Sequence, residues 1–533
     1  MRPILSELEG RRLLSTFTVT NFMVDDVNVA GTLRWAVGQA NSHAGDDTIN
    51  FDKQVFKTPR MITLTGTQLE LTDTTGTETI TGPKAGVTVS GGGLSRVFQV
   101  DGDVTAAFSG LAITGGATTD SGGGLFNDGG TVTLTKCTVS GNSAGTGGGL
   151  ATRFGGTATL TDCTVSGNSA SDNGGGLATR FGEVTLANCT VNGNTAGRSG
   201  GGLYIYSEVV NTLTDCTVSG NTAGGSGGGV FSYYGVTTLT DCTVSGNYAS
   251  NGGGLVGFLG VITLTGCTVS GNYASNDGGG LFCFGRTTLL TDCTVSGNSA
   301  GHDGGGLVGF RGAITLTGCT VSGNSAVRNG GGVYRQYGTT TLTDCTVSGN
   351  SASFGGGIAT DGATLNIASS EINNNRATSN GGGIRITFGR ATITDSVVNN
   401  NQVNSLETAL GGGIDCAYHS ILSLTNCTVK ANQANGVTAL GGGIDCEDSI
   451  LSLANCTVKA NQANGVTALG GGFYALNSTV DITNSKIREN EANGAVLGEG
   501  GGIYSSGSTL TLGSSKVKGN KASTSGDDIS FHP

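Results

Sequence analysis

Residues 157–177 read TATLTDCTVSGNSASDNGGGL, and the chain after about residue 105 consists largely of variants of this stretch. Its cysteine recurs at a spacing of 25 to 27 residues, and serine later takes its place. The recurring residues are Cys137, Cys163, Cys189, Cys216, Cys242, Cys267, Cys293, Cys319 and Cys345, followed by Ser370 and Ser396. Self-similarity at such a period is typical of a solenoid, in which each coil buries its apolar side against its neighbours.

The apolar positions of this stretch predict how one coil folds. Leu160, Cys163 and Val165 are its interior residues, and the gap between Leu160 and Cys163 breaks strict alternation, so a bend falls near Asp162. We predict one strand around TATLT, a second at CTV, a corner at 166–168 and a third strand opening at GGGL. Parallel strands joined by short right-handed crossovers form an all-β, single-stranded right-handed parallel β-helix with three strands and about 26 residues per coil.

The chain divides into three predicted parts: a leader or sorting-type segment at 1–15, an N-terminal cap with irregular first coils at 16–104, and the regular β-helix at 105–533. The cap contains a short helix within 31–43, because Leu33, Ala36, Val37 and Ala40 fall on one apolar stripe. A helix at this end would cover exposed core and unpaired strand edges.

Three side-chain rows follow from the coil register. Asparagines from Asn142 to Asn520 occupy one corner and are expected to hydrogen-bond between coils. Triple glycines provide turns with positive φ and close backbone packing. The cysteines are expected to be buried free thiols that act as small hydrophobes, because in-register neighbours lie too far apart for a good disulfide. Corner aspartates are ordinary turn residues rather than a cation row; they are Asp162, Asp215, Asp241, Asp292, Asp344 and Asp395.

Composition excludes several classes of protein. A net charge of −11 argues against a nucleic-acid partner, and no apolar run is long enough to span a membrane as a helix. The cysteines lack CxxC pairs and the four histidines share no repeat position, so we predict no metal site and no cofactor. Oligomeric state is left open.

The GGG-[LIV] motif followed by an SGNxA corner resembles the repeats of polymorphic outer-membrane protein passengers, and more broadly the pectin-lyase-like β-helix proteins of bacterial surfaces. Leu33, Arg34, Ala36, Ala40 and Asn41 resemble the helix that opens such proteins. A leader motif of bacterial surface proteins is matched by Leu8, Glu9, Arg11, Leu13 and Leu14. The resemblance implies an extracellular or cell-surface location and says little about activity, because this fold hosts enzymes and adhesins alike.

The best candidate for catalysis is the set Arg385, Asp415 and Asp445, one residue after GGG-[LI] in three successive coils. We expect these side chains to face outward and to stack. Two carboxylates near a cation could perform acid/base chemistry on a sugar or hold Ca²⁺ for a lyase. The alternative is a copied surface aspartate, because residues 411–440 and 441–469 are nearly the same sequence.

A row of aromatic residues is the candidate ligand-binding surface. Its members lie on the third strand and after it: Tyr204, Tyr206, Phe231, Tyr233, Phe258, Phe282, Phe284, Phe310, Tyr334 and Tyr337. They form either a platform for sugars or a protein partner, or a stabilising stack. Paired outward threonines, such as Thr133 with Thr135 and Thr159 with Thr161, resemble the ice-binding faces of some antifreeze proteins, but threonine is also a good strand former.

Two main hypotheses remain. The first is a non-enzymatic, secreted or cell-surface β-helix that binds a polysaccharide or a surface protein as a structural or adhesive element. The second is a carbohydrate-active enzyme, a lyase or hydrolase acting on an acidic polysaccharide. Coil lengths of 25 to 31 residues leave no long loops to enclose a substrate, which favours the first.

Overall fold

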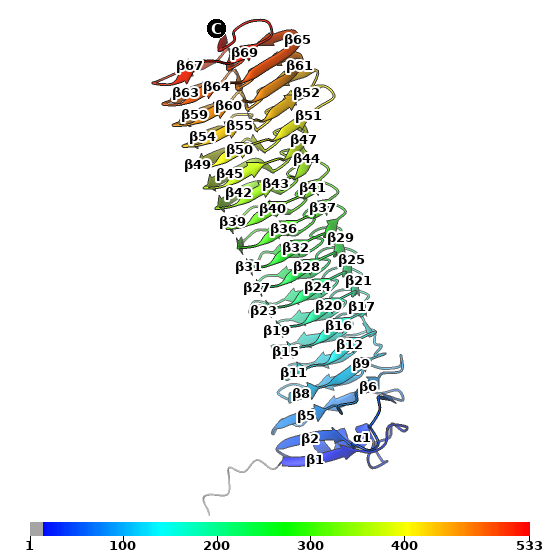
Figure 1. Ribbon diagram of the computed structural model, residues 1–533. Coiled ribbons are helices and arrows are strands. Elements are labelled where there is room, and N and C mark those ends of the chain that lie inside the picture. Colours follow the sequence, from blue (N-terminus) through cyan, green and yellow to red (C-terminus); the bar gives the residue numbers. More distant parts are fainter. Residues whose placement is uncertain (1–13) are drawn as a thin grey trace, which may run out of the picture. The chain divides into compact units, whose positions relative to one another are not determined.

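The computed structural model describes residues 14–533, which form β-strands and, within this range, one α-helix (Figure 1). The predicted leader motif, apart from Leu14, lies outside the described residues. The chain divides into two compact units, Met1–Tyr248 and Ala249–Pro533, and each is described separately.

The N-terminal unit begins with strand β1 (Leu14–Val19), helix α1 (Leu33–Ala40) and strand β2 (Asp46–Phe51), and β1 and β2 pair in parallel. Thr32 caps α1, because its hydroxyl oxygen accepts a hydrogen bond from the backbone N–H of Trp35 at 3.0 Å. The predicted apolar stripe of α1 is buried, and the helix packs against β1 and β2. The short N-terminal helix is therefore confirmed.

The regular coil of this unit follows the predicted bends. One coil and the start of the next contain β15 (Thr157–Thr161), β16 (Thr164–Ser166), β17 (Ser169–Ala170), β18 (Leu177–Arg180) and β19 (Glu183–Ala187). They belong to three parallel sheets. The strand after the glycines, β18, lies in the same sheet as β15 and β19, and the third sheet is instead made by two-residue strands such as β17.

This difference from the predicted third strand has a local cause. Only Phe181 and Gly182 separate β18 from β19, which is too few residues for a separate crossover. In the C-terminal unit the two strands fuse into one at β42 (Val333–Thr343) and at β45 (Ile358–Ala368). The structure thus has three sheets as predicted, but two predicted strands share one of them.

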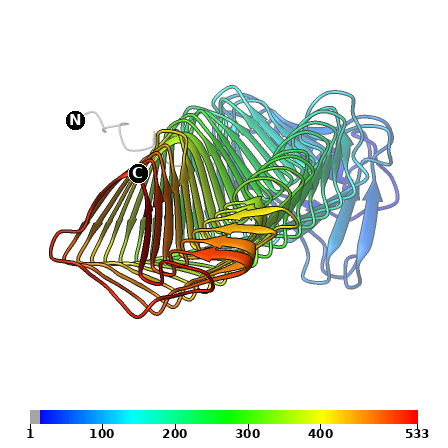
Figure 2. The same ribbon diagram turned by 90° about the horizontal axis from the view of Figure 1, so that it is seen from above.

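Successive coils pair residue for residue. In the N-terminal unit β15 pairs with β19, β16 with β20 (Thr190–Asn192) and β17 with β21 (Thr195–Ala196). In the C-terminal unit β38 (Leu307–Phe310) pairs with β42, and β40 (Thr320–Ser322) pairs with β43 (Thr346–Ser348). Seen from above, the strands of neighbouring coils lie over one another (Figure 2). The core is therefore a set of stacked Leu, Val, Ile and Cys side chains.

The corner asparagines hold the coils together, as predicted. The side-chain oxygen of Asn324 accepts hydrogen bonds from the backbone N–H and the side-chain amide of Asn298, at 2.9 and 3.0 Å. Its own amide donates to the oxygen of Asn350 at 3.0 Å and to the carbonyl of Val295 at 2.9 Å. Each fully buried asparagine thus satisfies polar groups that the corner takes out of the sheets.

All 14 cysteines are buried and free, which confirms that prediction, but they are more than small hydrophobes. The thiol of Cys319 accepts from the backbone N–H of Cys293 at 3.4 Å and donates to the carbonyl of Thr317 at 3.3 Å. The hydroxyl of Ser370 does the same, accepting from Cys345 N–H at 3.0 Å and donating to the carbonyl of Ala368 at 2.7 Å. Serine can therefore replace cysteine because both bridge the same backbone groups.

The triple glycines act as expected. Gly304 has a φ of +64°, in the left-handed region, and a Cβ on Gly305 would collide with the carbonyl oxygen of Ser325 in the next coil. The first glycine therefore makes the turn and the second allows close approach of the backbones.

Candidate functional site

The predicted catalytic set lies on three neighbouring strands of the C-terminal unit, β48 (Ile384–Thr387), β53 (Ile414–Ala417) and β58 (Ile444–Glu447). Arg385 pairs with Asp415, and Asp415 with Asp445, so the predicted stacking is correct. The predicted exposure is wrong: the two aspartates are only 0% and 1% exposed. Asn380 and Arg385 contact Asp415, and Tyr474 of the following coil stands beside Asp445.

Burial dominates the electrostatics of this carboxyl pair. The Nε–H of Arg385 donates to Asp415 Oδ2 at 3.1 Å, yet burial raises the pKa of Asp415 to about 6. Burial and the neighbouring Asp415 hold the pKa of Asp445 well above its usual range. Neither oxygen of Asp445 has a hydrogen-bond partner among the described residues, which also favours the neutral form of this carboxyl group. A carboxyl buried in this way cannot reach a sugar substrate.

A cavity of about 210 Å³ lies on the solvent side of Arg385 and is named the Arg385 cavity. Its lining consists of Asn329, Tyr334, Ala359, Thr360, Asp361, Arg385, Thr387, Phe388 and Tyr418. Asp361 is positioned by two side chains, because it accepts hydrogen bonds from the Thr387 hydroxyl and the Gln336 amide, each at 3.3 Å. The rings of Phe388 and Tyr418 stack with centroids 5.3 Å apart and planes 15° apart. The lining thus combines a cation, a carboxylate and an aromatic pair.

Arg385 presents part of its guanidinium to this cavity. Asp415 engages only the Nε–H, and the guanidinium lies 4.4 Å above the Phe354 ring. The two terminal nitrogens have no hydrogen-bond partner within residues 14–533. They can therefore bind a carboxylate or hydroxyl oxygen of a ligand.

The N-terminal unit has a cavity of similar composition, of about 190 Å³, named the Arg180 cavity. Its lining includes Arg153, Arg180, Asp172, Tyr204 and Tyr206. The Arg180 guanidinium lies 5.9 Å above the Tyr206 ring. Each unit thus combines arginine, aspartate and aromatic side chains beside the strand that follows the triple glycines.

The two comparisons with known proteins differ in outcome. The chain matches the family described as right-handed beta helix region over residues 79–258 and 258–416, which is more than half of its length. The chain belongs to the right-handed β-helix family. A comparison with curated proteins finds no match.

The predicted aromatic row of this β-helix pairs ring on ring within each unit. In the N-terminal unit Tyr204 stacks on Phe231 at 5.4 Å and Tyr206 on Tyr233 at 5.2 Å. In the C-terminal unit Phe258 stacks on Phe284 at 4.8 Å, and Phe282 lies 5.5 Å from Phe310 at a tilt. Tyr334 is buried at the edge of the Arg385 cavity. The rings support one another, and all but Tyr334 stay partly exposed, so ligand binding by this row stays a prediction.

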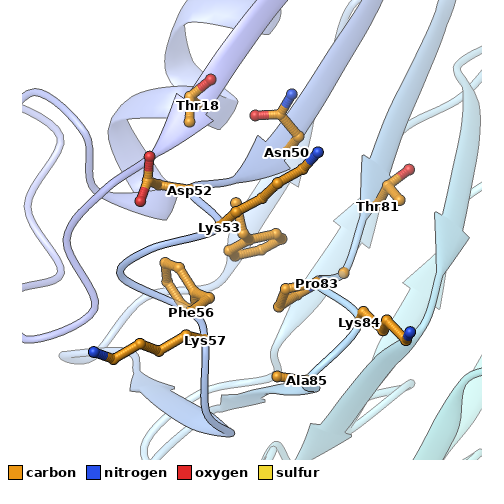
Figure 3. A pocket seen from close by; sticks show the side chains of 12 residues that line it. Thr18, Asn50, Asp52, Lys53, Phe56, Lys57, Thr81, Pro83, Lys84 and Ala85 are labelled. Atoms are coloured by element: carbon orange, nitrogen blue, oxygen red, sulfur yellow. The ribbon is translucent and has the colours of Figure 1, made fainter.

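A further cavity of the β-helix, of about 1010 Å³, is a groove near its N-terminal end (Figure 3). Phe51 and Phe56 are buried there, and Lys53, Lys57 and Lys84 are exposed at its rim. Figure 3 shows the side chains of Lys57 and Lys84 pointing to opposite sides. The sequence did not reveal this groove, because the lysines stand in the irregular region and meet only through the 52–57 loop and the 82–85 turn.

Other candidate sites of the β-helix find limited support. Among residues 14–533 no group of three or more His, Cys, Asp or Glu could hold a metal ion, and no helix there is long and apolar enough to cross a membrane. In the C-terminal unit the outward threonine row is interrupted, because Leu289 pairs between Thr263 and Thr315. A continuous threonine array of the ice-binding type is therefore absent from that part of the described chain.

The sequence analysis did not single out the carboxylate and the aromatic pair of the Arg385 cavity, which are Asp361, Phe388 and Tyr418. A usable signal existed for the two aromatics. Both follow a GGG-I strand at the position that Tyr337 holds in its own coil. Asp361 gave no such signal, because its role depends on Thr387 from the next coil.

Proposed function

We propose that this β-helix is a non-enzymatic, secreted or cell-surface protein that binds glycan chains as a structural or adhesive element. The observation that carries the proposal is the Arg385 cavity, in which free guanidinium nitrogens, a positioned carboxylate and a pair of exposed rings lie together. Sugars are recognised by this combination, because hydroxyl and carboxylate oxygens need hydrogen-bond partners and C–H faces need flat apolar surfaces.

The Arg180 cavity supports the same proposal, because the N-terminal unit repeats the combination with different residues. Each unit therefore offers its own site to a sugar polymer. Repeated weak sites suit an adhesive protein better than a single deep site does.

The buried carboxyl pair argues against the enzyme alternative. Asp415 and Asp445 are covered, so neither can exchange protons with a sugar in the Arg385 cavity. Asp361 stands alone there, whereas glycoside hydrolysis uses two carboxyl groups flanking the bond. Binding without cleavage is the function that this geometry favours.

The test is glycan-array binding by the full chain, followed by affinity measurement on the best glycan. Arg385→Met combined with Asp415→Asn removes the cation without leaving a buried charge, and we expect a loss of affinity of about tenfold or more. Asp415→Asn alone should bind as the wild type does. Arg390→Met is the matched surface control, because Arg390 is exposed on β49 (Arg390–Thr394) and does not line the cavity.

Two results would overturn the proposal. The first is unchanged affinity of the Arg385→Met, Asp415→Asn variant. The second is cleavage of a polysaccharide by the wild-type chain that Asp415→Asn abolishes, because this would assign catalysis to the buried pair.

A further inference from the structure

In the C-terminal unit, every turn after the post-glycine strand contains at least one residue with a left-handed backbone. The pairing of the strands places these residues in one row, named the turn row. Its members and their φ angles are Leu259 (57°), Gly285 (100°), Arg311 (61°), Tyr337 (54°), Gly362 (59°), Phe388 (52°), Tyr418 (59°), Asp448 (47°), Asn477 (50°) and Gly507 (59°). Bulky side chains thus occupy half of a row that favours glycine, asparagine and aspartate.

The same coils contain a second left-handed row at the corner before the cysteine position, named the corner row. Its members are Gly266, Asp292, Gly318, Asp344, Ser369, Asp395, Asn426, Asn455 and Asn484. Every residue here is glycine, aspartate, asparagine or serine. A left-handed turn in this coil therefore accepts small residues, and the geometry of the fold does not call for aromatic rings in the turn row.

Burial does not account for the rings either. Tyr337, Phe388 and Tyr418 are 55%, 62% and 49% exposed. The Tyr337 ring lies over the next coil, where a Cβ on Gly362 would stand 2.8 Å from its Cδ1 atom, so the absence of a side chain at Gly362 leaves room for it. Phe388 and Tyr418 stack in parallel and border the Arg385 cavity. Phe388 and Tyr418 lie on neighbouring coils, and Tyr337 lies two coils before Phe388, so the three exposed rings stand in the same row.

We infer that Tyr337, Phe388 and Tyr418 form a platform whose exposed ring surfaces contact the C–H groups of pyranose rings, and that this binding role explains their strained backbone. The inference rests on the proposed glycan binding and adds the ligand class: a polymer of equatorially substituted pyranoses that runs across the coils. Phe388 and Tyr418 are 5.3 Å apart, which matches about one sugar unit per coil. Arg385 then meets the polar edge of the same chain.

The test exploits the strain. Phe388→Asn with Tyr418→Asn keeps the left-handed turns but uses a residue that adopts them readily. We expect the thermal midpoint of the full chain to rise and the affinity for the best array glycan to fall by about tenfold or more, because two exposed aromatic contact surfaces are lost. Asp448→Asn is the matched control in the same row and should change neither quantity.

The outcomes separate this inference from the proposed function. A lower thermal midpoint would overturn the inference, because the rings would then stabilise the coil. Unchanged affinity in the double variant, with loss in Arg385→Met, Asp415→Asn, would overturn the platform and leave glycan binding intact. Absence of any bound glycan with the wild-type chain would overturn both. A raised midpoint together with weakened binding is the expected result.

Discussion

The corner row and the turn row of the C-terminal unit share a left-handed backbone conformation, but they differ in the size of their side chains. The corner row contains only Gly, Asp, Asn and Ser, whereas the turn row also takes Leu, Arg, Tyr and Phe. At the corner, each residue suits the left-handed backbone. In the turn row, the bulky residues raise the free energy of the folded state. The difference indicates that the corner was shaped by stability and the turn by something else.

A second feature that lowers stability lies on the same side of the coil as the turn row. The strand that leads into the turn row carries the buried pair Asp415 and Asp445, whose oxygens are only partly hydrogen-bonded. In the asparagine row, at the corner that follows the next strand after the corner row, the buried polar groups are instead paired. Unfavourable features therefore gather beside the Arg385 cavity, as expected of a binding surface.

The largest expected effect on stability comes from removing a side chain of the asparagine row. Asn324→Ala removes four hydrogen bonds, made with the Asn298 N–H, the Asn298 amide, the Val295 carbonyl and the Asn350 side-chain oxygen. Each buried hydrogen bond contributes about 1 kcal/mol, so the free energy of unfolding should fall by about 4 kcal/mol. Urea unfolding of the full chain measures this. A loss below about 1 kcal/mol would show that the asparagine row does not hold the coils together.

The next largest effect is a pH dependence of the free energy of unfolding, which arises from the buried carboxyl pair beside the turn row. In the folded chain the pKa of Asp415 is about 6, against an ordinary value of 3.8. The folded state therefore binds more protons than the unfolded chain as pH rises from about 4 to 6, and the free energy of unfolding falls by about 3 kcal/mol over that window. The raised pKa of Asp445 extends the fall to higher pH.

The double variant Asp415→Asn, Asp445→Asn should flatten this pH dependence and be more stable than the wild type at pH 7.5. Urea unfolding at pH 4.5 and pH 7.5 measures the difference, and Asp448→Asn, an exposed change nearby, is the control. Equal slopes in wild type and double variant would assign the pH dependence to other groups.

Much of the fold could be predicted from the repeat alone. The positions of Leu160, Cys163 and Val165 predicted which side chains face inward, and the corner asparagines predicted the bonds between coils. Because the sequence repeats strictly, each coil has the same arrangement of side chains, and the fold of one coil predicts that of many others. The sheet shared by two strands per coil was missed, because a turn as short as Phe181–Gly182 looks like a strand boundary in the sequence.

The site was predicted only in part, for a physical reason. Alternation correctly placed Asp415 and Asp445 in register on the outer side of their strand. Alternation could not show that Asn380, Arg385 and Tyr474 cover them, because coverage depends on how long side chains of neighbouring coils lie.

The sequence analysis did not predict the burial of Arg335 either, because that burial also depends on contacts with a neighbouring coil. It is fully buried at an interior position, where burial lowers its pKa to about 10, and it donates to the carbonyls of Arg311 and Gly312.

A smaller effect is expected from placing an aromatic side chain in the corner row. Asp344 is exposed in the corner row with a φ of 53°, so Asp344→Phe reproduces there the situation of Phe388. The left-handed backbone penalises the bulky side chain, and the free energy of unfolding should fall by about 1–2 kcal/mol. Urea unfolding against Asp344→Asn, which should be neutral, measures this. A neutral Asp344→Phe would mean that aromatic rings at left-handed turns cost little in this coil, and would weaken the case for function in the turn row.

The smallest effect concerns the interior of the corner. Cys319 and Ser370 bridge equivalent backbone groups, so Cys319→Ser should lower the free energy of unfolding by less than about 1 kcal/mol. Cys319→Ala leaves the Cys293 N–H and the Thr317 carbonyl without the side chain that joins them, and should cost about 1–2 kcal/mol. Parallel urea unfolding of the two variants compares them. Equal losses would mean that the thiol matters only for its volume, and the corner would then owe its order to the asparagine row alone.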